Sequence, residues 1–295
     1  SAAWSGVAGS AVPPPLGELA GQRRLRMTRM STRSLLIATT VPATLSAFLL
    51  PYARHFRACG WVVDGAANGI TACGECVEAF DRVFDVGWRR NPLDPRNFAG
   101  AVRRIRSVVE RGDYDIVHVH TPVAAFVTRY ALKTVRRGGK PRVVYTAHGF
   151  HFYQEGNRLR HPQYLLLERL VGHWLDYLVV INREDEEAVR RYNIVPPECL
   201  VYMPGIGVDT QYYDPARINT AAVVACRAEL GLGPDDPLFL MVAEFNSGKR
   251  HRDLLRAFAG LDLPRAHLVL AGEGPLAGEM RQLATTLGIM ERVHF

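Results

Sequence analysis

The sequence predicts an α/β fold built on two parallel β-sheets. Short apolar runs rich in β-branched residues recur along the chain, and segments with helical periodicity separate them. Runs of that length with turn residues at their ends are typical of strands buried on both faces. Nearly every run also stops at a polar or glycine-rich stretch. Because ligands of open α/β sheets bind at the carboxyl ends of the strands, we expect the functional residues there.

Eight strands are expected from these runs. They cover residues 35–38, 61–63, 116–119, 143–146, 178–181, 200–202, 238–242 and 268–270. Apolar residues three and four positions apart predict helices over 43–56, 98–109 and 161–174. In the last of these, the leucine-rich face of Leu165, Leu166 and Leu170 is expected to pack in the core. Asn182, three residues before Asp185, is expected to cap a further helix.

A change of composition predicts two domains. Residues 203–219 hold two glycines, two prolines and the pair Tyr212-Tyr213, and a new series of strands and helices follows them. We expect one domain over residues 34–212 and a second over 213–295. Residues 1–33 lack apolar periodicity and are expected to form a disordered basic leader. Two α/β domains joined in this way predict a small-molecule site in the cleft between them.

Composition excludes several classes. With 48% hydrophobic and 22% charged residues, the chain is neither fibrous, nor disordered, nor a multi-span membrane protein. Five scattered cysteines are typical of a reducing cytoplasm. Cys73 and Cys76 have the spacing of a metal or redox pair. Since no second pair follows, we predict plain thiols.

The net charge of +7 is concentrated in two segments. Residues 1–34 carry five arginines against one glutamate, and the segment Arg89 to Arg111 carries seven arginines against two acidic residues. A solvated helix face and an anionic membrane surface are both compatible with the second segment. We predict the membrane surface as a partner and no nucleic acid.

Histidines follow two neighbouring strands. His118 and His120 alternate along one strand, so they point to the same side. With His148 and His151 they offer a metal site, but we favour a buried His118 and a His120 that opens on the cleft. His148 precedes Gly149, which lets a ligand approach the backbone, and it is the candidate catalytic residue. A purely structural loop histidine remains the alternative.

The second domain offers a phosphate site. Asn246-Ser247-Gly248-Lys249 lies between a strand and a helix, where free N–H groups and a lysine suit a phosphate. The segment is not a P-loop, and Gly272-Glu273-Gly274-Pro275 is not a dinucleotide-binding motif. The latter argues against a dehydrogenase.

Five motifs in order resemble the family-4 type of retaining glycosyltransferases with the GT-B fold. They most resemble the branch that builds bacterial capsular, exo- and O-antigen polysaccharides. The motifs are residues 115–122 (DIVHVHTP), 146–150 (TAHGF), 204–210 (PGIGVDT), Lys249 and 270–276 (LAGEGPL).

The resemblance implies two Rossmann-like domains and transfer of a sugar from a nucleotide-sugar to an acceptor hydroxyl, with retention and without an obligatory metal or other cofactor. Its matching positions place His148 beside the transferred sugar, and Thr40 and His120 on the acceptor side. The implied donor-binding residues are Gly207, Lys249, Arg250, Gly272 and Glu273. The implied acceptor is a lipid-linked sugar or a growing polysaccharide. The implied location is the cytoplasm, at the inner face of the membrane.

Three departures from the family pattern stand out. Glu244 replaces an arginine that many relatives pair with the lysine on the diphosphate. Residues 39–44 replace a glycine-rich turn. The sequence stops at Phe295, before a pair of glutamates that hold the donor in relatives, so we expect an incomplete second domain. A nucleotide-sugar epimerase of the same fold and a non-catalytic glycan-binding module remain alternatives.

Overall fold

A computed structural model describes residues 32–89, 94–136, 139–150 and 161–295. The expected leader, apart from residues 32 and 33, and His151 lie outside these ranges. The chain forms two compact units, the first ending at Gly207 and the second spanning Val208–Phe295. The expected α/β class with parallel sheets is confirmed in both units.

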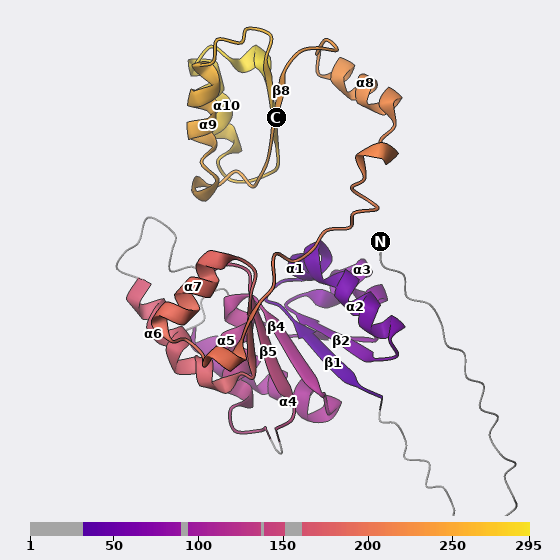
Figure 1. Ribbon diagram of the computed structural model, residues 1–295, viewed down its shortest axis with the longest axis vertical. Coiled ribbons are helices and arrows are strands. Elements are labelled where there is room, and N and C mark those ends of the chain that lie inside the picture. Colours follow the sequence, from indigo (N-terminus) through magenta and orange to yellow (C-terminus); the bar gives the residue numbers. More distant parts are fainter. Residues whose placement is uncertain (1–31, 90–93, 137–138, 151–160) are drawn as a thin grey trace, which may run out of the picture. The chain divides into compact units, whose positions relative to one another are not determined.

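The first unit is built on one parallel sheet with the strand order β3-β2-β1-β4-β5-β6-β7 (Figure 1). Its strands are β1 (Ser34–Ala38), β2 (Val62–Ala67), β3 (Arg82–Asp85), β4 (Ile116–His120), β5 (Arg142–Ala147), β6 (Tyr177–Val180) and β7 (Leu200–Tyr202). The order reverses between β1 and β4. That reversal is the point at which open α/β sheets leave a crevice at the strand ends.

Helices surround this sheet. They are α1 (Pro42–Thr44), α2 (Leu50–Ala58), α3 (Gly74–Ala79), α4 (Val102–Gly112), α5 (Pro122–Leu132), α6 (His161–Val171) and α7 (Arg183–Tyr192). Alternate residues of β1 belong to two separate cores. Leu36 packs in a core with Val117 and Val119 of β4, whereas Ile37 packs with Leu45 on the opposite side. Burial on both faces explains the continuous apolar runs.

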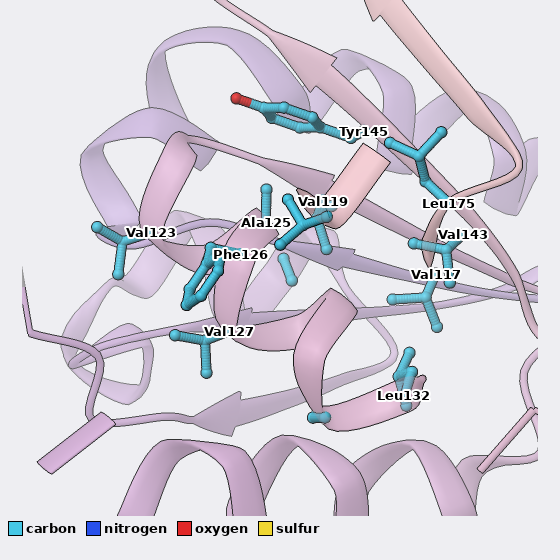
Figure 2. Packing of buried hydrophobic residues seen from close by; sticks show 14 of the residues in the cluster. Val117, Val119, Val123, Ala125, Phe126, Val127, Leu132, Val143, Tyr145 and Leu175 are labelled. Atoms are coloured by element: carbon cyan, nitrogen blue, oxygen red, sulfur yellow. The ribbon is translucent and has the colours of Figure 1, made fainter. Parts of the chain in front are cut away.

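The larger core lies between the sheet and the helices α4 and α5. Figure 2 shows Val117, Val119 and Val143 of the sheet with Phe126 and Leu132 of α5. No residue of this group is more than 7% exposed. The hydrophobic contacts therefore fix β4, which ends at His120, and β5, which His148 follows.

The first expected helix contains a π-helical segment. Residues Leu45–Leu49 form it between α1 and α2. Pro51 stands in the first turn of α2 and lacks an N–H, and in a regular α-helix its ring would clash with the carbonyl of Ala47. Wider hydrogen bonding relieves that clash, so a proline explains why one predicted helix becomes three segments.

Polar contacts explain β3, which was not predicted. Asp64 of β2 is fully buried and accepts two hydrogen bonds from Arg82 of β3, at 3.0 Å from Nε and 2.6 Å from Nη2 to Oδ2. The hydroxyl of Tyr114 also donates to Asp64. This strand is joined to β2 through the buried Asp64 and the half-exposed Arg82, and it carries no long apolar run.

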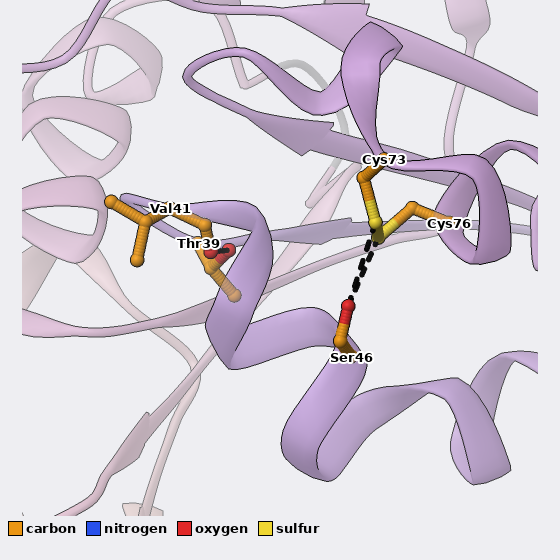
Figure 3. The surroundings of a disulfide bond; sticks show 5 residues. All are labelled: Thr39, Val41, Ser46, Cys73 and Cys76. Carbon is orange, nitrogen blue, oxygen red and sulfur yellow. Dashed lines mark hydrogen bonds between the residues drawn. A yellow bond between two sulfur atoms is a disulfide. The ribbon is translucent and has the colours of Figure 1, made fainter. Parts of the chain in front are cut away.

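Two predictions about side chains are wrong. Cys73 and Cys76 form a disulfide and are not plain thiols. In Figure 3 the hydroxyl of Ser46 lies beside both sulfur atoms, because the turn before α3 brings the pair together. On α6, Leu166 and Leu170 are exposed, and only Leu165 packs partly against the core.

The second unit contains a smaller parallel sheet with the order β10-β9-β8. Its elements are α8 (Thr220–Glu229), β8 (Leu238–Val242), α9 (His251–Ala259), β9 (His267–Ala271), α10 (Ala277–Thr286) and β10 (Val293–His294). Phe245, Leu255, Phe258 and Leu268 form its core. The strand order places the loops after β8 and β9 next to each other.

Candidate functional site

The carboxyl ends of β1 and β4 bring together two threonines. The hydroxyl oxygens of Thr40 and Thr121 lie 2.7 Å apart, and the Thr40 N–H donates to Thr121 Oγ1 at 3.1 Å. Thr121 has a φ of 68°, which is unusual for a β-branched residue. Strain of this kind gathers at functional sites. Thr40, the predicted acceptor-side residue, is therefore fixed by a neighbour that sequence reasoning did not single out.

Three histidines of β4 and the β5 loop are in contact. His120 Nδ1 lies 3.0 Å from His148 Nε2, and His118 Nε2 lies 2.8 Å from the hydroxyl of Thr146. The His118 and His120 ring centroids are 4.2 Å apart, so the two side chains point to the same side as predicted. The expectation that His120 opens on the cleft is wrong. His120 is only 3% exposed and does not open to solvent, while His118 is half-buried.

Burial keeps this cluster uncharged. It lowers the pKa of His118 to about 4, with a smaller contribution from His148. Burial, followed by repulsion from the other two histidines, holds the pKa of His120 well below its ordinary value. Burial also lowers the pKa of His148. All three rings are thus neutral at pH 7.

We expect the free energy of unfolding to fall as the pH is lowered from about 6.5 to about 4. In that range the histidines bind protons in the unfolded chain but stay unprotonated in the folded one. Each such histidine therefore changes the free energy of unfolding by about 1.4 kcal/mol per pH unit. Urea unfolding at a series of pH values measures the slope. His148→Gln should make the slope shallower than in the wild type, and identical slopes in the two proteins would contradict the assignment.

The loop that carries His148 is anchored at both sides. Gly149 has a φ of 115°, a conformation that favours glycine. The next N–H, that of Phe150, donates to Asp185 Oδ1 at 3.2 Å. Asp185 follows the helix cap Asn182, whose side-chain oxygen accepts the Asp185 N–H at 2.7 Å, as predicted. The cap of α7 therefore also positions the β5 loop.

Phe48 is a second residue that sequence reasoning missed. Its ring centroid lies 6.1 Å from that of His148, and the residue is 46% exposed. An exposed aromatic ring beside a histidine is suited to pack against a sugar ring. Phe48 was assigned to the apolar face of a regular helix. The π segment changes the direction of that face.

In the second unit, the loop after β8 orders Lys249. Asn246 Oδ1 accepts the Lys249 N–H at 3.1 Å, and Asn246 Nδ2 donates to Glu244 Oε2 at 2.9 Å. Lys249 is exposed at the start of α9. Arg250 follows with a φ of 58°, and its Nε lies 2.6 Å from the carboxylate of Asp253. An exposed lysine beside a helix N-terminus is an arrangement that suits an anion.

The loop after β9 packs closely on this one. The Phe245 N–H donates to the carbonyl of Glu273 at 2.8 Å. A Cβ added to Gly272 would lie 2.1 Å from the carbonyl oxygen of Ala243, and one added to Gly274 would lie 2.7 Å from the backbone of Phe245. Gly272 and Gly274 therefore allow two backbones to approach, and Glu273 supports the loop of Lys249 through its main chain.

We expect Gly272→Ala to lower the free energy of unfolding by at least about 2 kcal/mol, because the added methyl group overlaps a backbone oxygen. Gly278→Ala is the matched control. Gly278 lies in α10 with nothing within 4 Å of the added methyl group, so alanine should stabilise by about 0.5–1 kcal/mol. Chemical denaturation measures both, and equal stabilities would show that the loops separate freely.

The predicted residues therefore fall into two groups. Thr40, His120 and His148 gather at one rim of the first unit, and Lys249, Arg250, Gly272 and Glu273 gather at one rim of the second. Gly207 ends the first unit with a φ of 87°, next to Ile206, whose carbonyl accepts the Tyr52 hydroxyl at 3.0 Å. Within the described ranges, no cluster of three or more histidine, cysteine or acidic side chains is arranged to hold a metal ion.

In the comparison with known proteins, two different family models match two successive parts of the chain. The family model described as "Glycosyl transferase 4-like domain" matches residues 44–205, and the one described as "Glycosyl transferases group 1" matches residues 225–295. EpsD of Bacillus subtilis (strain 168), named as a glycosyltransferase, is 35% identical over 267 residues, which cover 90% of this chain and 68% of EpsD. A D-inositol 3-phosphate glycosyltransferase of Mycobacterium sp. (strain JLS) is 31% identical over 67% of this chain and 45% of its own length.

Solved structures share the fold. A glycosyltransferase from Rickettsia africae ESF-5 superimposes with a TM-score of 0.66 at 16% identity, over 90% of this chain and 68% of that one. The UDP-GlcNAc 2-epimerase of Neisseria meningitidis gives a TM-score of 0.59 at 12% identity, over 89% and 71%. The fold alone does not separate these activities, but the family models and EpsD do. The chain belongs to the family-4 type of glycosyltransferases with the GT-B fold, in their bacterial exopolysaccharide branch.

Proposed function

We propose that the protein transfers a sugar from a nucleotide-sugar to a hydroxyl of a lipid-linked sugar or growing polysaccharide, with retention at the anomeric carbon. The observation that carries the proposal is the ordered turn that presents Lys249 at the N-terminus of α9. A nucleotide-sugar is the family's donor class, and its diphosphate is the anion that such a turn suits. EpsD and the other named relatives support transferase chemistry.

Charge development gives these residues their roles. When the bond between the sugar and the diphosphate breaks, negative charge grows on the diphosphate. A lysine ammonium and the free N–H groups of a helix stabilise that charge, and preorganised donors of this kind contribute several kcal/mol. We assign Lys249 to the diphosphate, with Arg250 as a weaker neighbour because Asp253 already pairs with it. Since these groups take the charge, the proposed reaction needs no metal ion.

The first unit would hold the sugar and the acceptor. His148 is half-buried beside the exposed ring of Phe48, and Thr40 lies on the same rim. We assign His148 to the transferred sugar and this rim to the acceptor hydroxyl. Gly207, Gly272 and Glu273 are assigned to the donor side.

A panel of nucleotide-sugars, with and without a polysaccharide acceptor, tests this function through the release of free nucleotide. We expect one donor to release nucleotide at a rate that rises with acceptor concentration. An epimerase would instead convert the donor with no acceptor present, and a binding module would release nothing from any donor. Either of those two results would overturn the proposal.

We further propose that the Arg89 to Arg111 segment contacts an anionic membrane from the cytoplasmic side. No helix in the described parts of the chain is both long and apolar enough to span a bilayer. Arg103 and Arg104 are exposed on α4, and Arg104 Nε donates to the carbonyl of Asp85 at 3.3 Å. Arg106 donates to the carbonyl of Ala131 at 3.0 and 3.1 Å and supports packing. A test should therefore change only the first two.

Arg103→Glu together with Arg104→Glu should weaken co-sedimentation with vesicles of anionic lipid by about tenfold or more, since each basic residue near such a surface contributes about 1 kcal/mol. Neutral vesicles serve as the control. If the double charge reversal left binding to anionic vesicles unchanged, the proposed membrane contact would be wrong.

A further inference from the structure

We propose that His120 is a positioning residue that occupies Nε2 of His148, so that His148 meets its ligand through Nδ1 as an uncharged hydrogen-bond donor. The ligand oxygen in question belongs to the nucleotide-sugar, so this last step rests on the proposed function. The arrangement of the two rings is independent of it. Three features of the β4 and β5 ends support the inference.

The first feature is the contact between the rings. His120 Nδ1 and His148 Nε2 lie 3.0 Å apart, within the range of a hydrogen bond. The ring centroids are 5.3 Å apart. This bond uses one of the two nitrogens of His148. Within the described residues, no hydrogen bond is made to the other nitrogen, Nδ1, which leaves it available to a ligand.

The second feature is that His120 has little freedom to turn. It is 3% exposed, and the ring of His118 lies against it at 4.2 Å with an interplanar angle of 38°. His118 is itself held by the hydroxyl of Thr146 at 2.8 Å. Burial and the packed ring of His118 therefore hold His120 in one orientation, and the contact with His120 fixes the direction of the His148 ring.

The third feature is the proton count. Burial keeps both rings neutral, so the bond between them contains one proton, carried either by His120 or by His148. His120 Nε2 is buried and has no partner among the described residues. If His120 carried its proton there, a buried N–H would be left without an acceptor, and orphaned N–H groups are rarer in proteins than unused acceptors. His120 is therefore assigned its proton on Nδ1.

The chemistry follows from that assignment. His120 Nδ1–H donates to His148 Nε2, so the proton of His148 lies on Nδ1. The lone pair of His148 Nε2 accepts the hydrogen bond from His120, and the N–H at Nδ1 of His148 can donate to an oxygen of the ligand. His148 thus orients the sugar or stabilises charge on an oxygen, and it is not placed to abstract a proton as a general base.

The nitrogen chemical shifts of ¹⁵N-histidine-labelled protein test the assignment directly. The His148 signals are identified by their loss in His148→Gln. At pH 7.5 we expect His148 Nδ1 to show the shift of a protonated nitrogen and Nε2 that of a nitrogen with a lone pair. The reverse pattern would overturn the proposal. Because no substrate is needed, this result is decided separately from the transferase function.

Variants of His120 test the positioning role. In His120→Asn the side-chain amide can donate from nearly the position of Nδ1, so the shift pattern should persist and kcat should fall by less than about threefold. His120→Phe fills the space without a hydrogen-bond donor. In this variant the proton of His148 should be shared between Nδ1 and Nε2, and kcat should fall by about 100-fold with KM nearly unchanged. A His120→Phe protein with the wild-type pattern and rate would contradict the role.

Thr146→Val is the matched control for burial. It removes the hydrogen bond to His118 inside the same cluster, at nearly constant volume, but leaves the contact between His120 and His148 in place. We expect lower stability with an unchanged shift pattern and kcat. A loss of the pattern in this variant would show that general packing, and not His120 itself, sets the state of His148.

Discussion

Lys249→Ala is expected to weaken binding of the nucleotide-sugar by about 10- to 100-fold. A hydrogen bond between a charged lysine and a phosphate contributes about 1.5–3 kcal/mol, and 1.4 kcal/mol is a factor of ten in affinity. Lys249 is exposed, and its ordered backbone N–H, not its ammonium, is what Asn246 holds. Truncation should therefore leave the fold intact. Isothermal titration with the donor found in the nucleotide panel measures the loss.

Arg250→Ala is the natural control for Lys249→Ala. Its guanidinium is paired with Asp253, so its removal should weaken binding by less than the removal of Lys249. Lys249→Arg keeps the positive charge and should retain most of the affinity. Wild-type affinity in Lys249→Ala, or a larger loss of affinity in Arg250→Ala, would contradict the assignment of Lys249 to the diphosphate.

His148→Ala should lower kcat by about 100-fold or more. Loss of a group that stabilises charge or orients a reacting oxygen typically has an effect of that size. His148 is half-buried on a loop whose backbone is anchored through Phe150 and Asp185, so the loop should survive the change. Initial rates of nucleotide release at saturating donor measure the effect, and circular dichroism checks the fold.

His173→Ala provides the comparison for His148→Ala, because it removes an exposed histidine far along the chain from the rim residues. It should leave kcat unchanged. If His148→Ala also turned over at the wild-type rate, the β5 loop would not be part of the catalytic site.

The strands that carry the site were predictable from their apolar residues. β1, β4 and β5 are largely buried, whereas most residues of β8 are exposed. β1, β4, β5 and β8 appear in the sequence as apolar runs that end in polar residues, and the structure confirms each of them. β3 was missed because an ion pair between the buried Asp64 and the half-exposed side chain of Arg82 joins it to β2. Such a pair depends on which strands are neighbours in space, and local sequence does not contain that information.

Side-chain environments were less predictable than strands. Alternation correctly placed His118 and His120 on one side of β4, but it did not show which ring the neighbouring elements cover. The contact between His120 and His148 joins the ends of two strands, and its geometry depends on their register. The disulfide of Cys73 and Cys76 likewise depends on a turn whose geometry the spacing alone does not set.

The central proposal is that a nucleotide-sugar binds to the turn that presents Lys249 and that His148 contacts the transferred sugar. Hydrogen–deuterium exchange with and without a saturating donor tests it in a single measurement. The claim predicts slower exchange on donor binding both in the loop after β5, at residues 148–150, and in the turn and first helical residues at 246–253. Protection confined to one of these segments, or absent from both, would contradict it.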